Sequence, residues 1–441
     1  MRIAQLKRVA ALIGVGVLAV SCRLPEPSRE PAPAAEPPAE TTTTTTPPPA
    51  RSAPAVLTPL LADVLAPPVP VTASDGRTHL AYELLVTNAL PQQVALTGLT
   101  VLAGGPAAAA PTDDPAPTDD DAQRALLTLD ADGLREQTRL VGGAEPTAVL
   151  APGQTALVWL DVALGDADGT EDNGGPTRVP AELRHRLDYA VAHPQPPLVG
   201  ERGTETVAVV APEGAPVTVA PPVTGPSWVA VDGCCGLTGH RLAVQPLDGK
   251  LWAAERFAID LVQLSPDGRL FAGDAARPEN YPYFGTEVRA VADGPVVAVL
   301  DGLPDHTPGD PGPTPPGDAP GNHVVQDLGD GRYALYAHLA SGSVGVRVGD
   351  TLRTGDVLGR LGNSGRSTWP HLHLQLMDAP DPLRANGIPF VFDEVRVTAR
   401  LTGPEALGPL RAGEPAPLQS GVIARDRAAT MPLTFDVMTW M

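Results

Sequence analysis

Basic residues are scarce in this chain of 441 residues: 31 lysines and arginines stand against 51 aspartates and glutamates, for a formal net charge of −20. They form no block anywhere except near the N-terminus, around Lys7 and Arg8. Proteins that hold nucleic acid or another polyanion by bulk charge need such a block, so we exclude these functions. Solubility alone accounts for the acidic balance.

Cysteine is nearly absent, with only Cys22, Cys234 and Cys235 in the chain. A framework of disulfides is therefore excluded, and stability must come from packed hydrophobic cores. The length is sufficient for two or three domains with such cores. For the adjacent pair Cys234 and Cys235, a disulfide, two free thiols and a thiolate metal ligand all stay open.

The chain also has no long hydrophobic run. The apolar run Val9–Val20 is too short to span a bilayer comfortably. It follows a positively charged start and ends in small residues before Cys22, which resembles a bacterial lipobox. We expect a lipoprotein signal peptide over residues 1–22, a lipid on Cys22, and a place in the cell envelope, on the periplasmic side of the outer membrane in a Gram-negative cell. The alternative is an ordinary secretory signal and a secreted protein.

The next segment, residues 23–54, consists mainly of Pro, Ala, Glu and Thr. Such a segment cannot bury enough apolar surface to offset the entropy of ordering, so we predict a disordered tether. Proline-rich tethers extend by ~3 Å per residue and this one would reach up to roughly 100 Å. That length suits a membrane anchor that holds a domain out toward the cell wall.

Short β-like runs separated by turn residues follow and predict an all-β protein. Over residues 55–224 they favour an immunoglobulin-like β-sandwich, with an acidic disordered loop near Gly104–Asp121. A second β-rich domain is expected over residues 225–397, with a Pro/Gly/Asp rim loop at Gly302–Gly321, and the tail 398–441 stays unassigned. Two hairpins are expected in the second domain: Val288–Ala292 with Val296–Leu300, and Asn322–Leu328 with Arg332–Leu339.

Histidines gather in the second domain, where six of the nine lie between His240 and His373. On a strand, His371 and His373 point to the same face, while their leucine neighbours point to the other. A third histidine, His338, lies on another strand-like run. Two imidazoles side by side over an apolar face suit one metal ligand and one catalytic group.

Several short motifs between residues 234 and 393 resemble those of the lysostaphin/LytM-type zinc metallopeptidases, which cleave peptide cross-links in bacterial cell walls. The resemblance implies that the second domain is a LytM-type antiparallel β-sheet peptidase core that binds Zn²⁺ and acts on peptidoglycan peptides. The motifs are Arg256–Asp260, Tyr283–Gly285, Val291–Gly294, Gly321–Asn322, Tyr336–Leu339, Gly349–Asp350 with Gly355, Gly362–Gly365 and Pro370–His373.

The resemblance also implies residue roles. Asp260 and His373 correspond to zinc ligands, and His371 and His338 to the pair that activates water and stabilises the oxyanion. Zinc with an open coordination position lowers the pKa of bound water and polarises a scissile carbonyl. Neutral histidines beside that water can take its proton and pass it to the leaving amine.

One position departs from the family pattern, because Arg256 stands where the first zinc-binding histidine is usual. Arginine has no lone pair for zinc. In one interpretation another donor completes the site, with His240 ahead of Asn280 and the two adjacent cysteines. In a second, Arg256 pairs with Asp260 and replaces the metal. In a third, Arg256 anchors Asp260 as an outer partner of a zinc ligand.

Three functions follow from these interpretations. The first is a lipid-anchored zinc metalloendopeptidase that hydrolyses peptide cross-links of peptidoglycan. The second is a degenerate, metal-free domain that binds peptidoglycan or activates a cell-wall amidase as its partner. The third is a structural envelope lipoprotein whose sandwich carries the function.

Overall fold

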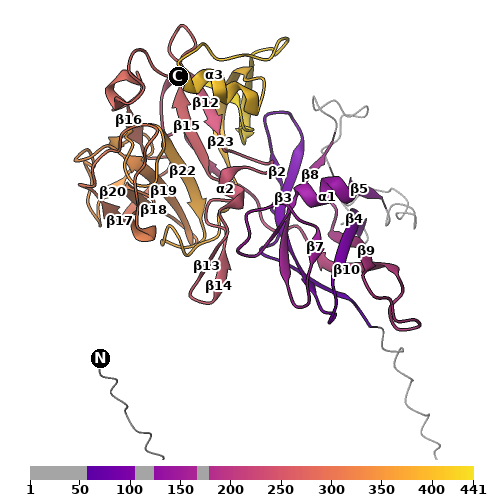
Figure 1. Cartoon of the computed structure of the whole chain (residues 1–441). Coiled ribbons are helices and arrows are strands. Elements are labelled where there is room, and N and C mark those ends of the chain that lie inside the picture. Colours follow the sequence, from indigo (N-terminus) through magenta and orange to yellow (C-terminus); the bar gives the residue numbers. More distant parts are fainter. Residues whose placement is uncertain (1–56, 105–123, 166–177) are drawn as a thin grey trace, which may run out of the picture. The chain divides into compact units, whose positions relative to one another are not determined.

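The computed structural model describes residues 57–104, 124–165 and 178–441 (Figure 1). The signal peptide, Cys22, the tether and nearly all of the acidic loop lie outside the described residues. Most elements in the described ranges are strands, which confirms the all-β prediction. None of the helices within these ranges is both long and apolar enough to cross a membrane.

The first part of the described chain consists of two antiparallel sheets that enclose a shared hydrophobic core. One short helix, α1 (Ala131–Glu136), follows the strand Ala125–Leu129 and precedes the strand Thr138–Leu140. The first sheet has the order β1 (Leu60–Val64), β3 (Thr78–Asn88), β8 (Thr155–Leu164), β6 (Thr138–Leu140), with β2 (Val71–Thr72) on β3. The second has the order β10 (Arg202–Val210), β9 (Glu182–Val191), β4 (Val94–Gly104), β5 (Ala125–Leu129), with β7 (Val149–Leu150) on β4.

Strand β3 is buried on both of its faces. Leu80, Tyr82 and Leu84 alternate along it and pack into the sandwich core. The residues between them, Ala81 and Glu83, are also buried, and Ala81 packs into a second hydrophobic core, formed mainly by residues after 216. The outer face of this sandwich sheet is therefore covered by the second part of the chain.

The second part is built on one large sheet. The segment beyond residue 397 contributes two of its strands, and β25 lies inside the sheet between β12 and β23. The order is β11 (Val217–Val219), β23 (Phe390–Arg400), β25 (Asp436–Trp440), β12 (Gly225–Val231), β15 (Ile259–Gln263), β22 (Leu372–Met377), β19 (Arg332–Leu339), β18 (Asn322–Gly329), β17 (Gly294–Leu300), β20 (Thr351–Leu352), with β24 (Arg425–Thr430) on β23.

Shorter elements surround the large sheet. Two pairs of short strands form separate ladders, β13 with β14 and β16 with β21. The elements are α2 (Gly239–Leu242), β13 (Gln245–Leu247), β14 (Lys250–Trp252), η2 (Pro278–Asn280), β16 (Glu287–Arg289), η3 (Pro316–Asp318), β21 (Val357–Arg360), η4 (Pro404–Ala406) and α3 (Leu407–Arg411).

Of the two expected hairpins, one is confirmed and one is wrong. Strands β18 and β19 pair in antiparallel register around the Gly329–Gly331 turn, as predicted. Strands β16 and β17 do not pair, because β17 has β18 on one edge and β20 on the other, and β16 pairs with β21 instead. Both edges of β17 are already occupied, so the turn at Asp293–Pro295 leads to a different ladder.

Candidate metal centre

Two neighbouring strands bring Asp260 and His373 together. Asp260 in β15 is directly opposite His373 in β22, and His373 Nδ1 lies 3.0 Å from Asp260 Oδ1. His371 precedes β22 by one residue, and its Nε2 lies 3.3 Å from Asp260 Oδ2. The common face predicted for the two histidines is the face that meets Asp260.

His240 reaches the same carboxylate from α2. This short helix begins after Thr238, whose side chain accepts a hydrogen bond from the Arg241 backbone N–H. His240 Nδ1 donates to the backbone carbonyl of Asp232, at 2.8 Å, and Nε2 lies 3.3 Å from Asp260 Oδ1. Asp232 follows β12, which pairs with β15, so the loop after β12 returns His240 to the end of β15.

The three side chains fit a zinc ion. Their donor atoms all lie within 4.8 Å of one another, and two imidazoles with one carboxylate form a usual zinc ligand set. The Nδ1–H of His240 is held by a carbonyl, which leaves Nε2 for a metal. In His373, Nε2 lies 2.9 Å from Gln375 Oε1 and can donate to it, which leaves Nδ1 for a metal.

The charges at this centre are strongly coupled. Burial disfavours the charged form of His240, but the Asp260 carboxylate outweighs it and raises the pKa of His240 to about 10. Burial likewise opposes the charged form of Asp260, but the adjacent His371 and His240 hold the pKa of that carboxyl well below its usual range. A divalent ion beside the anionic Asp260 carboxylate would take over the favourable charge interaction that the proton of His240 now provides.

His338 and His371 form a second pair beside the three ligands. Their ring centroids are 4.6 Å apart, and donor atoms of His338, His371 and His373 lie within 4.8 Å of one another. His338 Nδ1 lies 2.8 Å from the Ser364 carbonyl, and His371 Nδ1 lies 2.7 Å from the Trp369 carbonyl. Burial, reinforced by His371 and His373, lowers the pKa of His338 well below its usual range, so its imidazole is neutral.

A cavity of about 1110 Å³ opens onto these side chains. Its lining contains all five residues of the two groups, together with Trp369 and part of the loop predicted to form a rim. The rim residues that line it include Gly309, Pro311, Thr314 and Pro316. The cavity therefore leaves open space beside the histidines.

Arg256 lies elsewhere than we expected. Strand β15 begins only at Ile259, and a turn covers residues 254–257, so the alternation that would put Arg256 on the face of Asp260 does not apply. Its Nη2 lies 2.6 Å from Glu83 Oε2. The two interpretations in which Arg256 contacts Asp260 are corrected by this pairing with Glu83.

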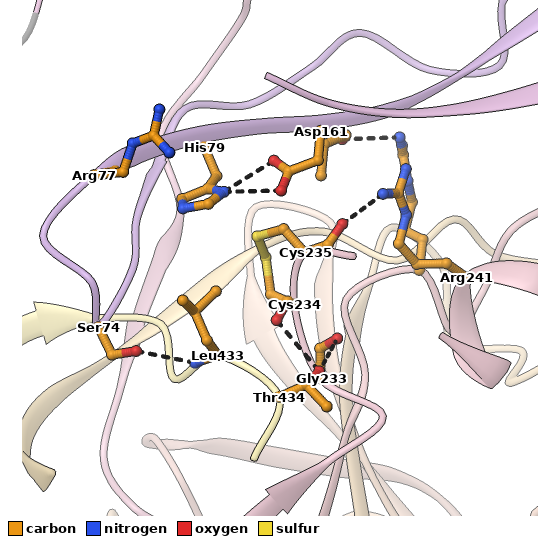
Figure 2. Close-up of a disulfide and its surroundings, with 12 residues drawn as sticks. Ser74, Arg77, His79, Asp161, Gly233, Cys234, Cys235, Arg241, Leu433 and Thr434 are labelled. Carbon is orange, nitrogen blue, oxygen red and sulfur yellow. Dashed lines mark hydrogen bonds and ion pairs between the residues drawn. A yellow bond between two sulfur atoms is a disulfide. The ribbon is translucent and has the colours of Figure 1, made fainter. Parts of the chain in front are cut away.

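The other candidate donors are also engaged away from Asp260. Cys234 and Cys235 form a disulfide, which decides among the three states left open for them (Figure 2). Asn280 donates to the backbone carbonyl of Asp274. His240 is the candidate that the fold brings to Asp260.

Sequence analysis missed one residue beside the centre, Gln375, and one that pairs with Arg256, Glu83. Gln375 lies two residues after His373 on the same face of β22, and this spacing could have identified it. Glu83 is a charged residue within the apolar run of β3, which was a visible signal of a buried ion pair.

Part of this site lies in a segment that matches a known protein family. Residues 281–385 match the model for peptidase family M23. The chain contains a peptidase family M23 domain. The matched range includes His338, His371 and His373, but it begins after Asp260. This match confirms the resemblance to the lysostaphin/LytM-type enzymes and supports a hydrolase of the metallopeptidase kind.

Several solved structures are similar to this chain. The catalytic domain of the A109H mutant of the prophage-encoded M23 protein EnpA from Enterococcus faecalis has 20% identity and a TM-score of 0.24, with 38% of this chain and 92% of that chain covered. The catalytic domain of lysostaphin from Staphylococcus simulans has 22% identity and a TM-score of 0.21, with 37% and 88% covered. A zinc-containing peptidase from Vibrio cholerae has 13% identity and a TM-score of 0.20, with 72% and 83% covered. At these TM-scores the matches describe similarity and add nothing to the family assignment.

Proposed function

We propose that this protein is a zinc-dependent endopeptidase that hydrolyses peptide cross-links of bacterial peptidoglycan. The observation that carries the proposal is the group formed by His240, Asp260 and His373 inside the cavity of an M23 protein. His240 takes the place of the ligand that Arg256 cannot supply. Peptidoglycan is the substrate class of the lysostaphin/LytM-type enzymes that the motifs resemble.

His240, Asp260 and His373 would hold Zn²⁺, which supplies an acidified water and a polarised carbonyl. His371 and His338 both present Nε2 to the site, since each Nδ1 lies beside a backbone carbonyl. A neutral Nε2 accepts a proton from the attacking water. The imidazolium so formed then stabilises the developing oxyanion and returns the proton to the leaving amine.

A degenerate, metal-free domain that binds peptidoglycan or activates a cell-wall amidase is the less supported function. This function requires the guanidinium of Arg256 to neutralise Asp260 in place of a metal. Arg256 pairs with Glu83 instead. In the described residues, Asp260 has three histidine neighbours, and two of them form with it a group of donor atoms that could bind a metal ion.

We place the enzyme in the cell envelope, held by a lipid on Cys22 and by the tether over residues 23–54. This part of the proposal rests on the sequence, because both segments lie outside the described residues. Labelling with a radioactive fatty acid, in cells that express the wild type or Cys22→Ser, tests it. Label in the wild type alone supports the anchor, and no label in either leaves a secreted enzyme.

The activity is tested with the purified mature chain, zinc and cross-linked muropeptides, followed by chromatography of the products. We expect cleavage by the wild type, cleavage without loss by the exposed control His193→Ala, and no cleavage by His371→Ala. His371→Ala should keep its zinc, and His373→Ala should lose both zinc and activity. Failure of the zinc-supplied wild type to cleave, or equal cleavage by His371→Ala, would remove the proposal.

A further inference from the structure

One glutamate of the sandwich is paired with two arginines of the M23 part. Glu83 Oε2 lies 2.6 Å from Arg256 Nη2, and Glu83 Oε1 lies 3.0 Å from Arg241 Nη2. The side chains are 0%, 4% and 2% exposed for Glu83, Arg256 and Arg241, respectively. The cluster is thus withdrawn from water at the contact between the two parts of the chain.

Buried charges persist only where each one finds opposite charge or dipoles. Glu83 supplies the negative charge, and three carbonyl oxygens accept hydrogen bonds from Nη1 and Nη2 of Arg241, while its Nε has no partner among the described residues. The three carbonyl oxygens belong to Cys235, at 2.6 Å from Nη1, and to Tyr82 and Leu160, at 3.0 and 3.2 Å from Nη2. Figure 2 shows Arg241 reaching the carbonyl oxygen of Cys235 beside the sandwich strand that carries Asp161.

Each arginine belongs to a segment that carries a ligand of the candidate metal centre. Arg241 follows His240 directly in α2, and Arg256 lies in the turn that leads to Asp260. A helix of four residues has too few hydrogen bonds to hold its own position. Arg241 fixes it through Glu83 and also through its backbone carbonyl, which accepts a hydrogen bond from Trp159 Nε1 at 2.7 Å.

We propose that Glu83 is a positioning residue for the metal centre. Through Arg241 it fixes the helix that presents His240, and through Arg256 it fixes the turn before Asp260. The inference rests on the proposed function, in that it takes His240, Asp260 and His373 as the zinc ligands. Under it, the sandwich is a structural part of the catalytic centre and more than a spacer or docking module.

The test measures zinc affinity in the full mature chain by competition with a chromophoric chelator. For Glu83→Gln we expect affinity to fall by about 10–100-fold, the usual effect of removing an outer partner of a metal ligand. The visible absorption of the cobalt(II)-loaded protein, which reports ligand geometry, should change as well. If Glu83→Gln does not fold, Arg256→Gln serves instead, because it leaves Glu83 paired with Arg241.

Asn88→Ala is the matched control. Asn88 is fully buried on the same strand, β3, and its side-chain hydrogen bonds, to Gln92, Leu150 and Leu90, stay within the sandwich. It should lower the melting temperature and leave zinc affinity and the cobalt spectrum unchanged. A role for Glu83 in stability alone would give Glu83→Gln the same result as this control.

The outcomes separate the two proposals. If the wild type binds no zinc, both are overturned. If zinc is bound by the wild type and lost in His373→Ala, but folded Glu83→Gln and Arg256→Gln bind it unchanged, the role of Glu83 is overturned and the function stands. Weaker binding in these variants with unchanged binding in Asn88→Ala supports both.

Discussion

His240 Nε2 lies 3.3 Å from Asp260 Oδ1, although the two residues come from a four-residue helix and a sheet strand. The Asp260 carboxylate therefore has a third histidine neighbour, in addition to His371 and His373. Under the proposed function, His240 supplies the metal ligand that Arg256 cannot provide.

The first prediction concerns His240 itself. His240→Ala should weaken zinc binding by more than about 100-fold, because removal of a ligand costs more than removal of an outer partner. Equilibrium dialysis with metal analysis checks this against the exposed His193→Ala. Stoichiometric zinc in His240→Ala at wild-type affinity would exclude His240 as a ligand.

The second prediction concerns Gln375. Its Oε1 orients the His373 ring, so Gln375→Ala should lower zinc affinity by about 10–100-fold. Gln326→Ala is a matched control, because Gln326 in β18 is also almost completely buried, and its side chain hydrogen-bonds to Tyr336 in β19 and to the Ala292 carbonyl. It should lower the melting temperature without a change in zinc affinity. Equal affinities for the two variants would contradict the orienting role.

The third prediction is a dependence of stability on pH through His79. Burial opposes its charge, but the carboxylates of Asp161 and Asp75 prevail and raise the pKa of His79 to about 9 from 6.5. Figure 2 shows the contact between His79 and Asp161. A raised folded-state pKa stabilises fully below the unfolded value, so this contribution is present below 6.5 and is lost as pH rises through about 9. Its size is roughly 3 kcal/mol.

His79→Gln should therefore reduce the loss in unfolding free energy between about pH 6 and about pH 10. Urea unfolding monitored by tryptophan fluorescence measures it. An identical pH profile for the wild type and His79→Gln would show that the pair with Asp161 and Asp75 does not stabilise the fold.

The fourth prediction concerns β25. Met438 is fully buried in this inner strand, whereas Met441, three residues later, is fully exposed. Met438→Ala should cost about 2–5 kcal/mol of unfolding free energy, as for other buried large-to-small substitutions. Met441→Ala should cost nothing measurable. Similar melting temperatures for both variants would contradict the inner position of β25.

The sequence predicted those parts of the site that depend on local alternation and motif. The common face of His371 and His373 follows from the two-residue period of a strand, and the β18–β19 hairpin follows from its glycine turn. These features are set by neighbours in sequence, so a single chain is sufficient to read them.

What the sequence could not supply were contacts between distant segments. Arg256 and Glu83 are separated by 173 positions, and nothing local to either residue names the other. The expected pairing of Arg256 with Asp260 failed because a turn interrupts the strand before Ile259. The place of β25 was equally hidden, since strand order in a sheet is a property of the whole fold.

The position of β25 also has a consequence for biosynthesis. Strand β12 leads into the His240 loop and borders β15, and its other edge is taken by β25, which is synthesised more than 170 residues after Asp260. A nascent chain without β25 thus lacks the strand that pairs with this edge of β12. The part of the large sheet beside the candidate metal centre is therefore complete only after β25 has been made.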